Sequence, residues 1–321
     1  MKPKPACVRR PAEHWPRRLI AVSVTLLVVV NAIAFRGLWP SFGAPYLIIH
    51  ADDAGVWRSV NRGTIEAMER GLVTSASIMV PCPGFEEFAE YARSRPEKDF
   101  GIHLTLISDW DDVRWGPVSD VATVASLIEP DGNFWRTIDQ FVRHAKTDEI
   151  ERELRAQVGK GQDRGIRVSH LDCHKNALLW RPDLVELYVR LGQEFDVPIR
   201  FCKTFPAEWR DDLPPDCIAA YHRQLDVLRR RRFPLPDVVD TENYDLSHTV
   251  KQEYFLDALR KLRPGISVAV IHCADRNSSE WLPPDVAKRH ADTQAFLAPE
   301  TAAEVSAQNV RLIDWKSLTG H

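Results

Sequence analysis

Beyond Tyr46 the chain alternates between short apolar segments and longer amphipathic ones. The short segments are rich in β-branched residues and end near glycine, proline or charged residues, which is typical of buried strands. The longer segments repeat an apolar residue every three or four positions, which predicts helices. The predicted strands cover residues 46–51, 75–80, 101–105, 168–171, 199–202, 238–240, 267–271 and 311–314.

Amphipathic segments between these strands predict helices over residues 59–70, 147–165, 182–195 and 246–262. Thr147 is the predicted N-cap of the second helix, in which Ile150, Leu154 and Val158 repeat every four residues. Helices that separate hydrophobic strands imply parallel βαβ units. The pattern therefore predicts an α/β fold, an irregular TIM-like (β/α) barrel with parallel strands.

The N-terminal part follows a different pattern. Six lysines and arginines within residues 1–18 precede an apolar run over residues 19–35. A run of this length predicts a hydrophobic N-terminal helix that spans a membrane, with its basic end in the cytoplasm. Ala32-Ile33-Ala34 offers a cleavage site, so a removable signal sequence stays open as an alternative.

This pattern predicts a division of the chain into four parts. Residues 1–18 form a basic cytoplasmic leader, residues 19–35 a membrane anchor or signal sequence, residues 36–44 a linker, and residues 45–321 the folded domain. The domain is expected outside the cytoplasm, in the periplasm or extracellular space. It would be anchored if the hydrophobic segment is kept and secreted if that segment is cleaved.

Composition narrows the classes of partner. A formal charge of −3 predicts no polyanionic partner such as nucleic acid. Six cysteines without a CxxC pair match neither a zinc ribbon nor a dense disulfide framework. Composition leaves the oligomeric state open.

The strongest local signal for chemistry lies between Leu47 and Gly55, where an apolar strand ends on Asp52 and Asp53. In a parallel α/β fold, the carboxyl ends of the strands form the edge at which active sites lie. One carboxylate can bind a metal there while the other faces a water or a substrate. A helix cap beside a surface acid would also account for two aspartates, so other residues must decide.

Further strand ends carry histidine. His103 stands within an apolar strand, His170, Asp172 and His174 occupy the end of a second, and His272 ends a third. A buried polar side chain requires a partner. Imidazole and carboxylate groups together suit zinc or a harder divalent ion with open positions for water. The coincidence of these strand ends predicts a metal site.

In this order and spacing, the motifs resemble those of the YdjC-like carbohydrate deacetylases. The resemblance covers residues 46–315, nearly the whole predicted domain. It rests on the segments Ala51-Asp52-Asp53-x-Gly55, Val60-Asn61-x-Gly63, Gly71-Leu72-Val73-Thr74-Ser75, Gly101-Ile102-His103-Leu104 and His170-Leu171-Asp172-x-His174.

The resemblance implies a metal-dependent deacetylase domain over residues 45–321. Such a domain removes acetyl groups from an N-acetylated amino sugar, oligosaccharide or sugar-bearing lipid with one divalent ion, Mg²⁺ or Zn²⁺. The implied roles are metal ligand for Asp53, His103 and His174, general base for Asp52 and general acid for His272. Beside these ligands, His170 and Asp172 are expected to orient them instead of binding the metal.

Two other functions remain open at this point. The same metal site could serve an esterase or a phosphoesterase, because an Asp/His₂ site does not by itself select the bond. A non-catalytic carbohydrate-binding relative is the third possibility. Four tryptophans could stack on sugar rings, although packing in the core or on the surface accounts equally well for them: Trp110, Trp115, Trp135 and Trp281.

Overall fold

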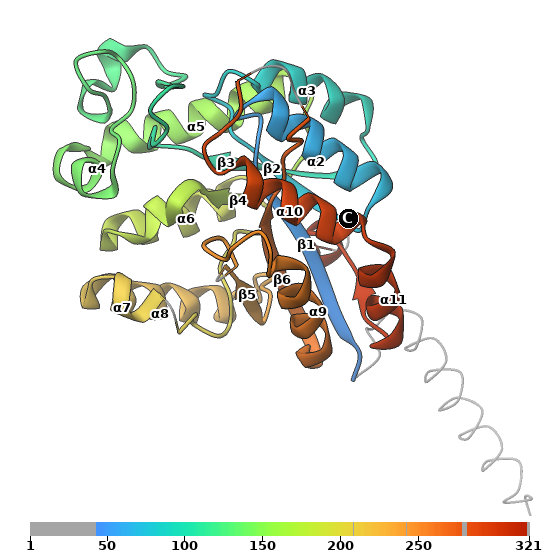
Figure 1. The fold of residues 1–321 in the computed structure, drawn as a ribbon. Helices are drawn as coiled ribbons and strands as arrows, with labels where there is room; N and C mark the ends of the chain where they lie inside the picture. The colour runs from blue at the N-terminus through green and yellow to red at the C-terminus, as the bar shows by residue number, and fades with distance from the viewer. Residues whose placement is uncertain (1–42, 208, 242, 278–280, 320–321) are drawn as a thin grey trace, which may run out of the picture. The chain divides into compact units, whose positions relative to one another are not determined.

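The computed structural model describes residues 43–319 except 208, 242 and 278–280. Within these residues seven parallel strands form one sheet in the order β4-β3-β2-β1-β6-β5, with β7 also paired to β1 (Figure 1). The strands are β1 (Pro45–Ala54), β2 (Ser75–Ile78), β3 (Asp99–Leu104), β4 (Val168–Cys173), β5 (Val238–Asp240), β6 (Gly265–His272) and β7 (Arg311–Leu312).

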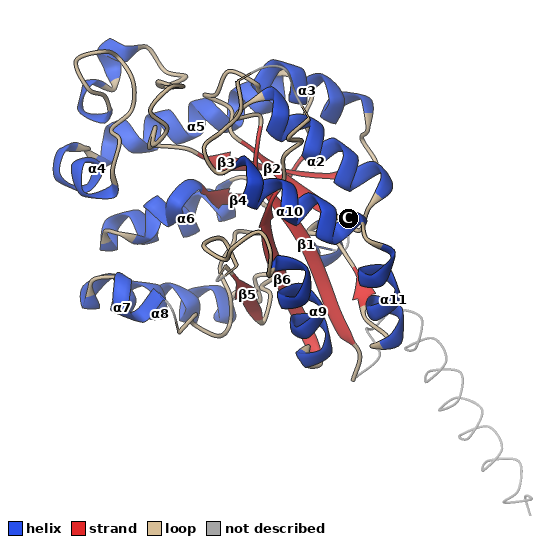
Figure 2. Cartoon of the chain, in the orientation of Figure 1, coloured by secondary structure: helices blue, strands red, loops and turns tan. Residues whose placement is uncertain are grey.

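Helices surround the strands, as Figure 2 shows. Several begin where the sequence offers a helix start: proline stands in the first turn of α6, α8 and α11, where its missing N–H costs nothing. The α-helices are α2 (Arg58–Arg70), α3 (Phe85–Ser94), α4 (Ile138–His144), α5 (Thr147–Asp163), α6 (Pro182–Glu194), α7 (Trp209–Asp212), α8 (Pro215–Arg230), α9 (Lys251–Lys261), α10 (Val286–Leu297), α11 (Pro299–Ala307) and α12 (Lys316–Thr319). The 3₁₀ helices are η1 (Val121–Thr123), η2 (Ala125–Leu127) and η3 (His174–Leu179).

The four predicted helices correspond to α2, α5, α6 and α9. The predicted cap of α5 is wrong by one residue. Lys146 is the N-cap, and Thr147 already belongs to the helix. The Thr147 hydroxyl donates to the Asp183 carboxylate at the start of α6, so a contact with the neighbouring helix replaces the local cap.

The segment over residues 199–202 is predicted as a strand, but the structure gives it a single bridge from Ile199 to Leu171 of β4. A turn in which the Phe201 amide donates to the Ile199 carbonyl interrupts the extended backbone. Further on, the Lys203 and Thr204 amides donate to the chain just before β5, each at 3.0 Å. This irregular segment therefore lies between the two edge strands of the sheet.

The fold is a parallel α/β half-barrel. The prediction of a TIM-like α/β architecture is confirmed in this form, while the regular strand ladder stays open between β4 and β5 within the described residues. The reason lies in the irregular segment just described, whose backbone turns instead of pairing continuously with either edge.

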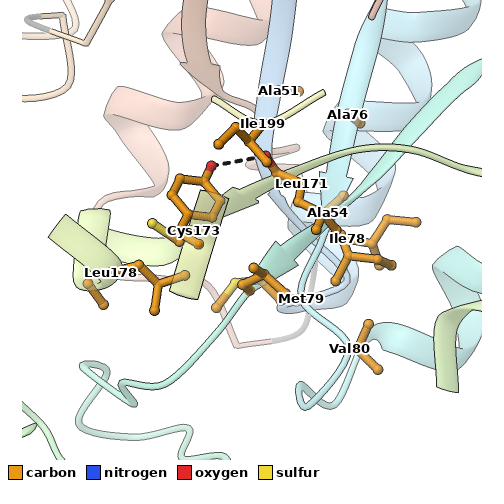
Figure 3. Packing of buried hydrophobic residues seen from close by; sticks show 14 of the residues in the cluster. Ala51, Ala54, Ala76, Ile78, Met79, Val80, Leu171, Cys173, Leu178 and Ile199 are labelled. Atoms are coloured by element: carbon orange, nitrogen blue, oxygen red, sulfur yellow. Dashed lines mark hydrogen bonds between the residues drawn. The ribbon is translucent and has the colours of Figure 1, made fainter. Parts of the chain in front are cut away.

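Strand alternation separates two apolar layers. Leu47, Ile49 and Ala51 of β1 belong to the large cluster between the strands and the helices, part of which is drawn in Figure 3. Ile48 belongs to a second, smaller cluster on the other face, which also holds the fully buried Trp315. Because successive strand residues point to opposite faces, the odd-numbered residues of β1 line one layer and the even-numbered ones the other.

The structure also bears on the predicted location. The predicted leader (1–18), hydrophobic segment (19–35) and most of the linker (36–44) lie outside the described residues, so this division of the chain stays a prediction. In the part of the chain that is described, no helix is both long enough and apolar enough to span a membrane. This finding contradicts the predicted location, a membrane-anchored or secreted domain outside the cytoplasm, and gives no support to the membrane as a partner.

Helix α2 packs unusually closely against the chain that follows β6. A Cβ placed on Gly63 would lie 2.4 Å from the carbonyl carbon of Ala274, a backbone atom. The Asp275 amide also donates to the Ser59 carbonyl of α2 at 2.8 Å. Gly63 therefore allows α2 to approach the segment directly after His272, the last residue of β6.

We expect Gly63→Ala to destabilise the fold by about 1–3 kcal/mol, because the added methyl group meets backbone that must move. Gly159→Ala is the matched control, since a Cβ there meets nothing within 4 Å in helix α5. That change should stabilise the protein by about 0.5–1 kcal/mol through helix propensity. Urea unfolding of both variants measures the two free energies, and equal effects would contradict the close-packing argument.

Candidate metal centre and active site

Strand alternation brings the predicted polar residues to one face of the sheet. His50 and Asp52 continue the face that begins with Ile48 in β1, and His272 continues the face of Val268 and Val270 in β6. The same period of two places His103 on β3 and the run 170, 172, 174 at the end of β4. The sheet face that carries Ile48 thus changes from apolar to polar toward the carboxyl ends of the strands.

Asp53 departs from this alternation. In a regular strand, Asp52 and Asp53 would point to opposite faces. Asp53 instead has a φ of +65°, in the left-handed region that a side chain with a Cβ rarely adopts. The pairing of β1 with β2 is irregular at this place, between Ala51 and Ala54. This backbone conformation lets both carboxylates line the same cavity.

Asn61 of α2 stabilises the turn that follows Asp53. Its side-chain oxygen accepts from the Gly55 amide at 2.8 Å, and its side-chain nitrogen donates to the Gly84 carbonyl at 2.9 Å. Gly55 has a φ of +86°, which glycine adopts without strain. The Val60-Asn61-x-Gly63 motif therefore supports the site from behind.

The three predicted metal ligands lie together. Asp53, His103 and His174 are buried, and their candidate ligand atoms all lie within 4.8 Å of one another. Asp53 Oδ1 is 3.3 Å from both His103 Nε2 and His174 Nδ1. Although buried, this oxygen accepts no hydrogen bond from the described residues. A buried carboxylate oxygen without a donor, facing two imidazole nitrogens, fits a divalent cation.

Each imidazole is held through its other nitrogen. His103 Nδ1 is 2.8 Å from Asp172 Oδ1, and His174 Nε2 is 3.0 Å from Asp109 Oδ1. Burial would raise the pKa of both carboxyls, but the facing imidazoles outweigh it and keep the pKa below the usual range. Ionised carboxylates only accept, so the imidazoles donate. His103 Nε2 and His174 Nδ1 are thereby directed toward Asp53, an arrangement typical of metal-binding histidines.

The electrostatics of the centre favour a cation. Burial lowers the pKa of His103, but Asp172 and Asp52 more than offset it and raise that pKa to about 10. Without an ion, a proton therefore occupies His103 Nε2. A metal ion and this proton compete for the same lone pair, so binding of the ion releases the proton.

Asp52 is held by Arg200. Nη1 of Arg200 donates to both oxygens of Asp52 at 2.7 Å, and His50 Nε2 lies 3.1 Å from Oδ1. Burial would raise the pKa of Asp52, yet the Arg200 guanidinium and then His103 lower it to about 2. Asp52 is therefore ionised and fixed in orientation.

His272 ends β6 and is paired in register with Asp52 of β1. Its Nε2 lies 3.9 Å from Asp53 Oδ2. Burial lowers the pKa of His272 to about 4, with Arg289 adding to the effect and Asp53 opposing it. The imidazole is consequently neutral near pH 7. Its Nδ1 is buried and has no hydrogen-bond partner among the residues described.

The two predicted orienting residues have different surroundings. Asp172 contacts the His103 ligand directly, as predicted for an orienting group. The imidazole of His170 instead stacks on Trp315, with the ring centroids 4.9 Å apart, and bonds to Ser169. A Cβ on Gly101 would come within 2.3 Å of His170 Nε2, so glycine there makes room for this ring. His170 makes no hydrogen bond to a proposed ligand in the described structure.

Four residues of the site are not predicted from the sequence: His50, Asp109, Arg200 and Arg289. His50 and Arg200 had a usable signal, because each is a polar residue within a predicted apolar strand. Asp109 lies in a long irregular stretch, and Arg289 lies on α10. Nothing in their local sequence marks these last two.

A cavity of about 530 Å³ opens over the centre and includes both aspartates, the ligand histidines and His272. Trp110, Trp180, Trp209 and Tyr244 also line it. Of the tryptophans considered from the sequence, Trp110 alone lines the described cavity. The others pack elsewhere: Trp115 in the core, Trp135 on His144 and Trp281 on Trp57 and Trp110.

Comparison with known proteins identifies the family. The model of the YdjC-like protein family matches residues 46–307. The chain belongs to this family. The resemblance stated from the motifs is thereby confirmed. A solved structure from Enterococcus faecalis V583, described as a candidate cellobiose-phosphate cleavage protein, has a TM-score of 0.68 and covers 86% of this chain and 99% of its own. At 24% identity, that likeness shows the fold alone.

Curated relatives of this YdjC-like protein carry the name carbohydrate deacetylase. The Thermus thermophilus protein is 32% identical over 259 residues, which cover 80% of this chain and 88% of the relative. The Brevibacillus brevis protein is 37% identical over 166 residues, which cover 52% of this chain and 63% of the relative. The second match thus spans less than two thirds of that relative's length.

We expect His174→Ala to lose the bound metal ion, because two of the three proposed ligands cannot retain a divalent ion tightly. Asp109→Asn keeps His174 as a ligand and changes only the group that orients its imidazole. The affinity for the metal ion should therefore fall roughly 10- to 100-fold without being abolished. Elemental analysis and metal titration of the two purified variants measure this. A full equivalent of metal in His174→Ala would contradict the assignment of His174 as a metal ligand.

Replacing Arg200 should change the pH dependence of the reaction. Arg200 keeps the pKa of Asp52 at about 2, so Arg200→Gln removes the opposing charge and burial then raises that pKa. The acidic limb of the kcat/KM profile should therefore move to higher pH. An unchanged acidic limb in a folded variant would show that Asp52 ionisation does not control the rate.

Proposed function

We propose that this YdjC-like protein is a metal-dependent hydrolase that removes the acetyl group from an N-acetylated amino sugar, oligosaccharide or sugar-bearing lipid. One observation carries the proposal. The buried group of Asp53, His103 and His174 lies in a cavity that also holds an ionised Asp52 and a neutral His272. These groups can supply the Lewis acid, general base and general acid for amide hydrolysis by water.

The coarser prediction of an enzyme that acts on amide bonds is confirmed by family membership together with relatives named carbohydrate deacetylase. The same names support an acetylated carbohydrate as the substrate. Which sugar is bound, and whether a metal is required, belong to the proposal.

Asp53, His103 and His174 would hold one divalent ion: the two imidazoles suit Zn²⁺, and the carboxylate with open positions for water suits Mg²⁺. When bound, the ion supplies Lewis acidity, which polarises the acyl carbonyl and lowers the pKa of water. Asp172 and Asp109 keep the two imidazoles turned toward that position.

Asp52 takes the proton from the attacking water. Two hydrogen bonds from Arg200 fix both of its oxygens, so the carboxylate keeps one orientation. A carboxyl with a pKa of about 2 is a weak base, and its contribution is therefore position and constant ionisation more than proton affinity. Arg200 serves the reaction by holding Asp52.

His272 delivers a proton to the leaving nitrogen. Because its pKa is about 4, the imidazole is neutral at the start and must first receive the proton that it passes on. Asp52 and His272 are register partners on adjacent strands, so base and acid lie side by side. The proton taken from water can thus return to the amine over a short path.

The lining of the cavity suits a largely uncharged ligand with flat apolar faces. Trp110, Trp180 and Trp209 offer surfaces of the kind on which sugar rings pack. The basic side chains of the described cavity wall are each paired with a carboxylate: Lys175 with Asp109, Arg200 with Asp52, and Arg289 with Asp53. This pairing disfavours a phosphate ester as substrate. The intact base and acid disfavour a purely binding role.

Acetate release tests this function. The metal-loaded protein is incubated with N-acetylglucosamine, chitooligosaccharides and N-acetylated glycolipids, and acetate is measured enzymatically. We expect release from at least one of them, loss of release on chelation, and recovery on adding Zn²⁺ or Mg²⁺. Asp52→Asn should retain the metal and lose activity. Cleavage of aryl acetates or phosphate esters without any amide hydrolysis would favour the esterase alternative.

A further inference from the structure

Arg289 has an unusually constrained guanidinium group. The side chain extends from α10 and is 2% exposed. Nη2 donates to Asp53 Oδ2 at 2.8 Å, and Nε donates to Asp285 Oδ2 at 2.7 Å. The ring centroid of Trp110 lies 5.6 Å from the guanidinium carbon. Two charged hydrogen bonds and an aromatic neighbour fix the plane of the group.

One nitrogen of this group has no acceptor. Nη1 of Arg289 is buried and makes no hydrogen bond within the described residues. A buried donor without an acceptor is costly, and the cost is greater for a charged group. Arg289 also lines the cavity that contains the metal centre. Since a guanidinium only donates, the partner of Nη1 must be an acceptor from outside the described residues, such as a ligand oxygen or a water.

The position of Arg289 indicates which part of the ligand that is. Its partner Asp53 Oδ2 also lies 3.9 Å from His272 Nε2, while Asp53 Oδ1 faces the two ligand imidazoles. Arg289 thus contacts the carboxylate that also faces His272 and the ligand imidazoles, at the place where the proposed function puts the scissile amide.

We propose that Nη1 of Arg289 donates a hydrogen bond to the acyl oxygen of the bound substrate and is a further catalytic residue of the deacetylation. This inference rests on the proposed function. In this role Arg289 stabilises the negative charge that develops on the acyl oxygen. A fixed cation in a site shielded from water is well suited to this.

The negative charge arises on the acyl oxygen when water adds to the amide. The water oxygen bonds to the carbonyl carbon while Asp52 takes a water proton, and the π pair of the carbonyl moves onto the acyl oxygen. Arg289 stabilises the resulting negative oxygen without transferring a proton. When the carbonyl re-forms, the carbon–nitrogen pair leaves with the nitrogen, which takes a proton through His272. The products are the free amine and acetic acid, which ionises to acetate by releasing the second water proton to solvent.

Two variants test this role. Arg289→Lys keeps a positive charge beside Asp53 but cannot contact Asp53, Asp285 and the acyl oxygen at once. Arg289→Ala removes the group entirely. We expect kcat for acetate release to fall roughly 100- to 1,000-fold in both, with KM nearly unchanged, because the contact strengthens only as negative charge develops. Metal content and melting temperature are measured on the same samples.

Chemical rescue separates a catalytic contact from a structural one. Methylguanidine at low millimolar concentration should restore part of the activity of Arg289→Ala, since it can occupy the same place. Asp52→Asn is the matched control, because it lacks a different group and should gain nothing from methylguanidine.

Three results would overturn the inference. A raised KM with unchanged kcat would show that Arg289 binds a sugar hydroxyl. Loss of metal or of thermal stability without rescue would show a structural ion pair. Full activity of Arg289→Lys would show that only the charge matters. If the wild-type protein releases no acetate, the proposed deacetylase function itself is refuted. The three results above instead refute only the role of Arg289.

Discussion

Burial of several carboxylates at one point is the constraint on which this structure depends. Asp52, Asp53 and Asp172 are all nearly inaccessible to water, and buried charges are stable only when they are paired. Arg200 pairs with Asp52 and Asp172, whose second positive neighbour is His103, and Arg289 pairs with Asp53. The irregular chain after β4 and the helix α10 are therefore needed for charge balance, and the proposed metal ion completes it.

The left-handed backbone at Asp53 turns a strand into a site. Without it, the two neighbouring aspartates would face different layers, one toward the apolar core behind the sheet. The local strain is offset by Asn61 and by Gly55, which fix the turn from the helix side. Asp52, Asp53 and Asn61 therefore act together, because Asn61 holds the turn that directs Asp53 into the site.

The sequence predicts the parts of this protein that depend on periodicity. Within the described residues, seven of the eight predicted strands form, because alternation and β-branched composition specify them locally. The strand expected at residues 199–202 is reduced to a single bridge because the backbone turns there, where the Phe201 amide donates to the Ile199 carbonyl. Asp109 and Arg289 could not be found, since a loop and a helix reach the site only through the tertiary fold. The prediction for residues 19–35 used the length of the apolar run and the basic residues before it, and this segment lies outside the described residues.

The pairing of β1 with β6 has a consequence for how the chain folds. Residues 45–52 pair with residues 265–272 at eight consecutive positions, so the central strand contacts a partner more than two hundred residues away in sequence. Non-local pairing of this kind slows folding, because a long loop must close before any contact is gained. Until β6 arrives, β1 presents an unpaired apolar edge that other chains can join. Slow, chaperone-sensitive folding and aggregation of fragments that end before β6 follow from the same strand pair that aligns Asp52 with His272.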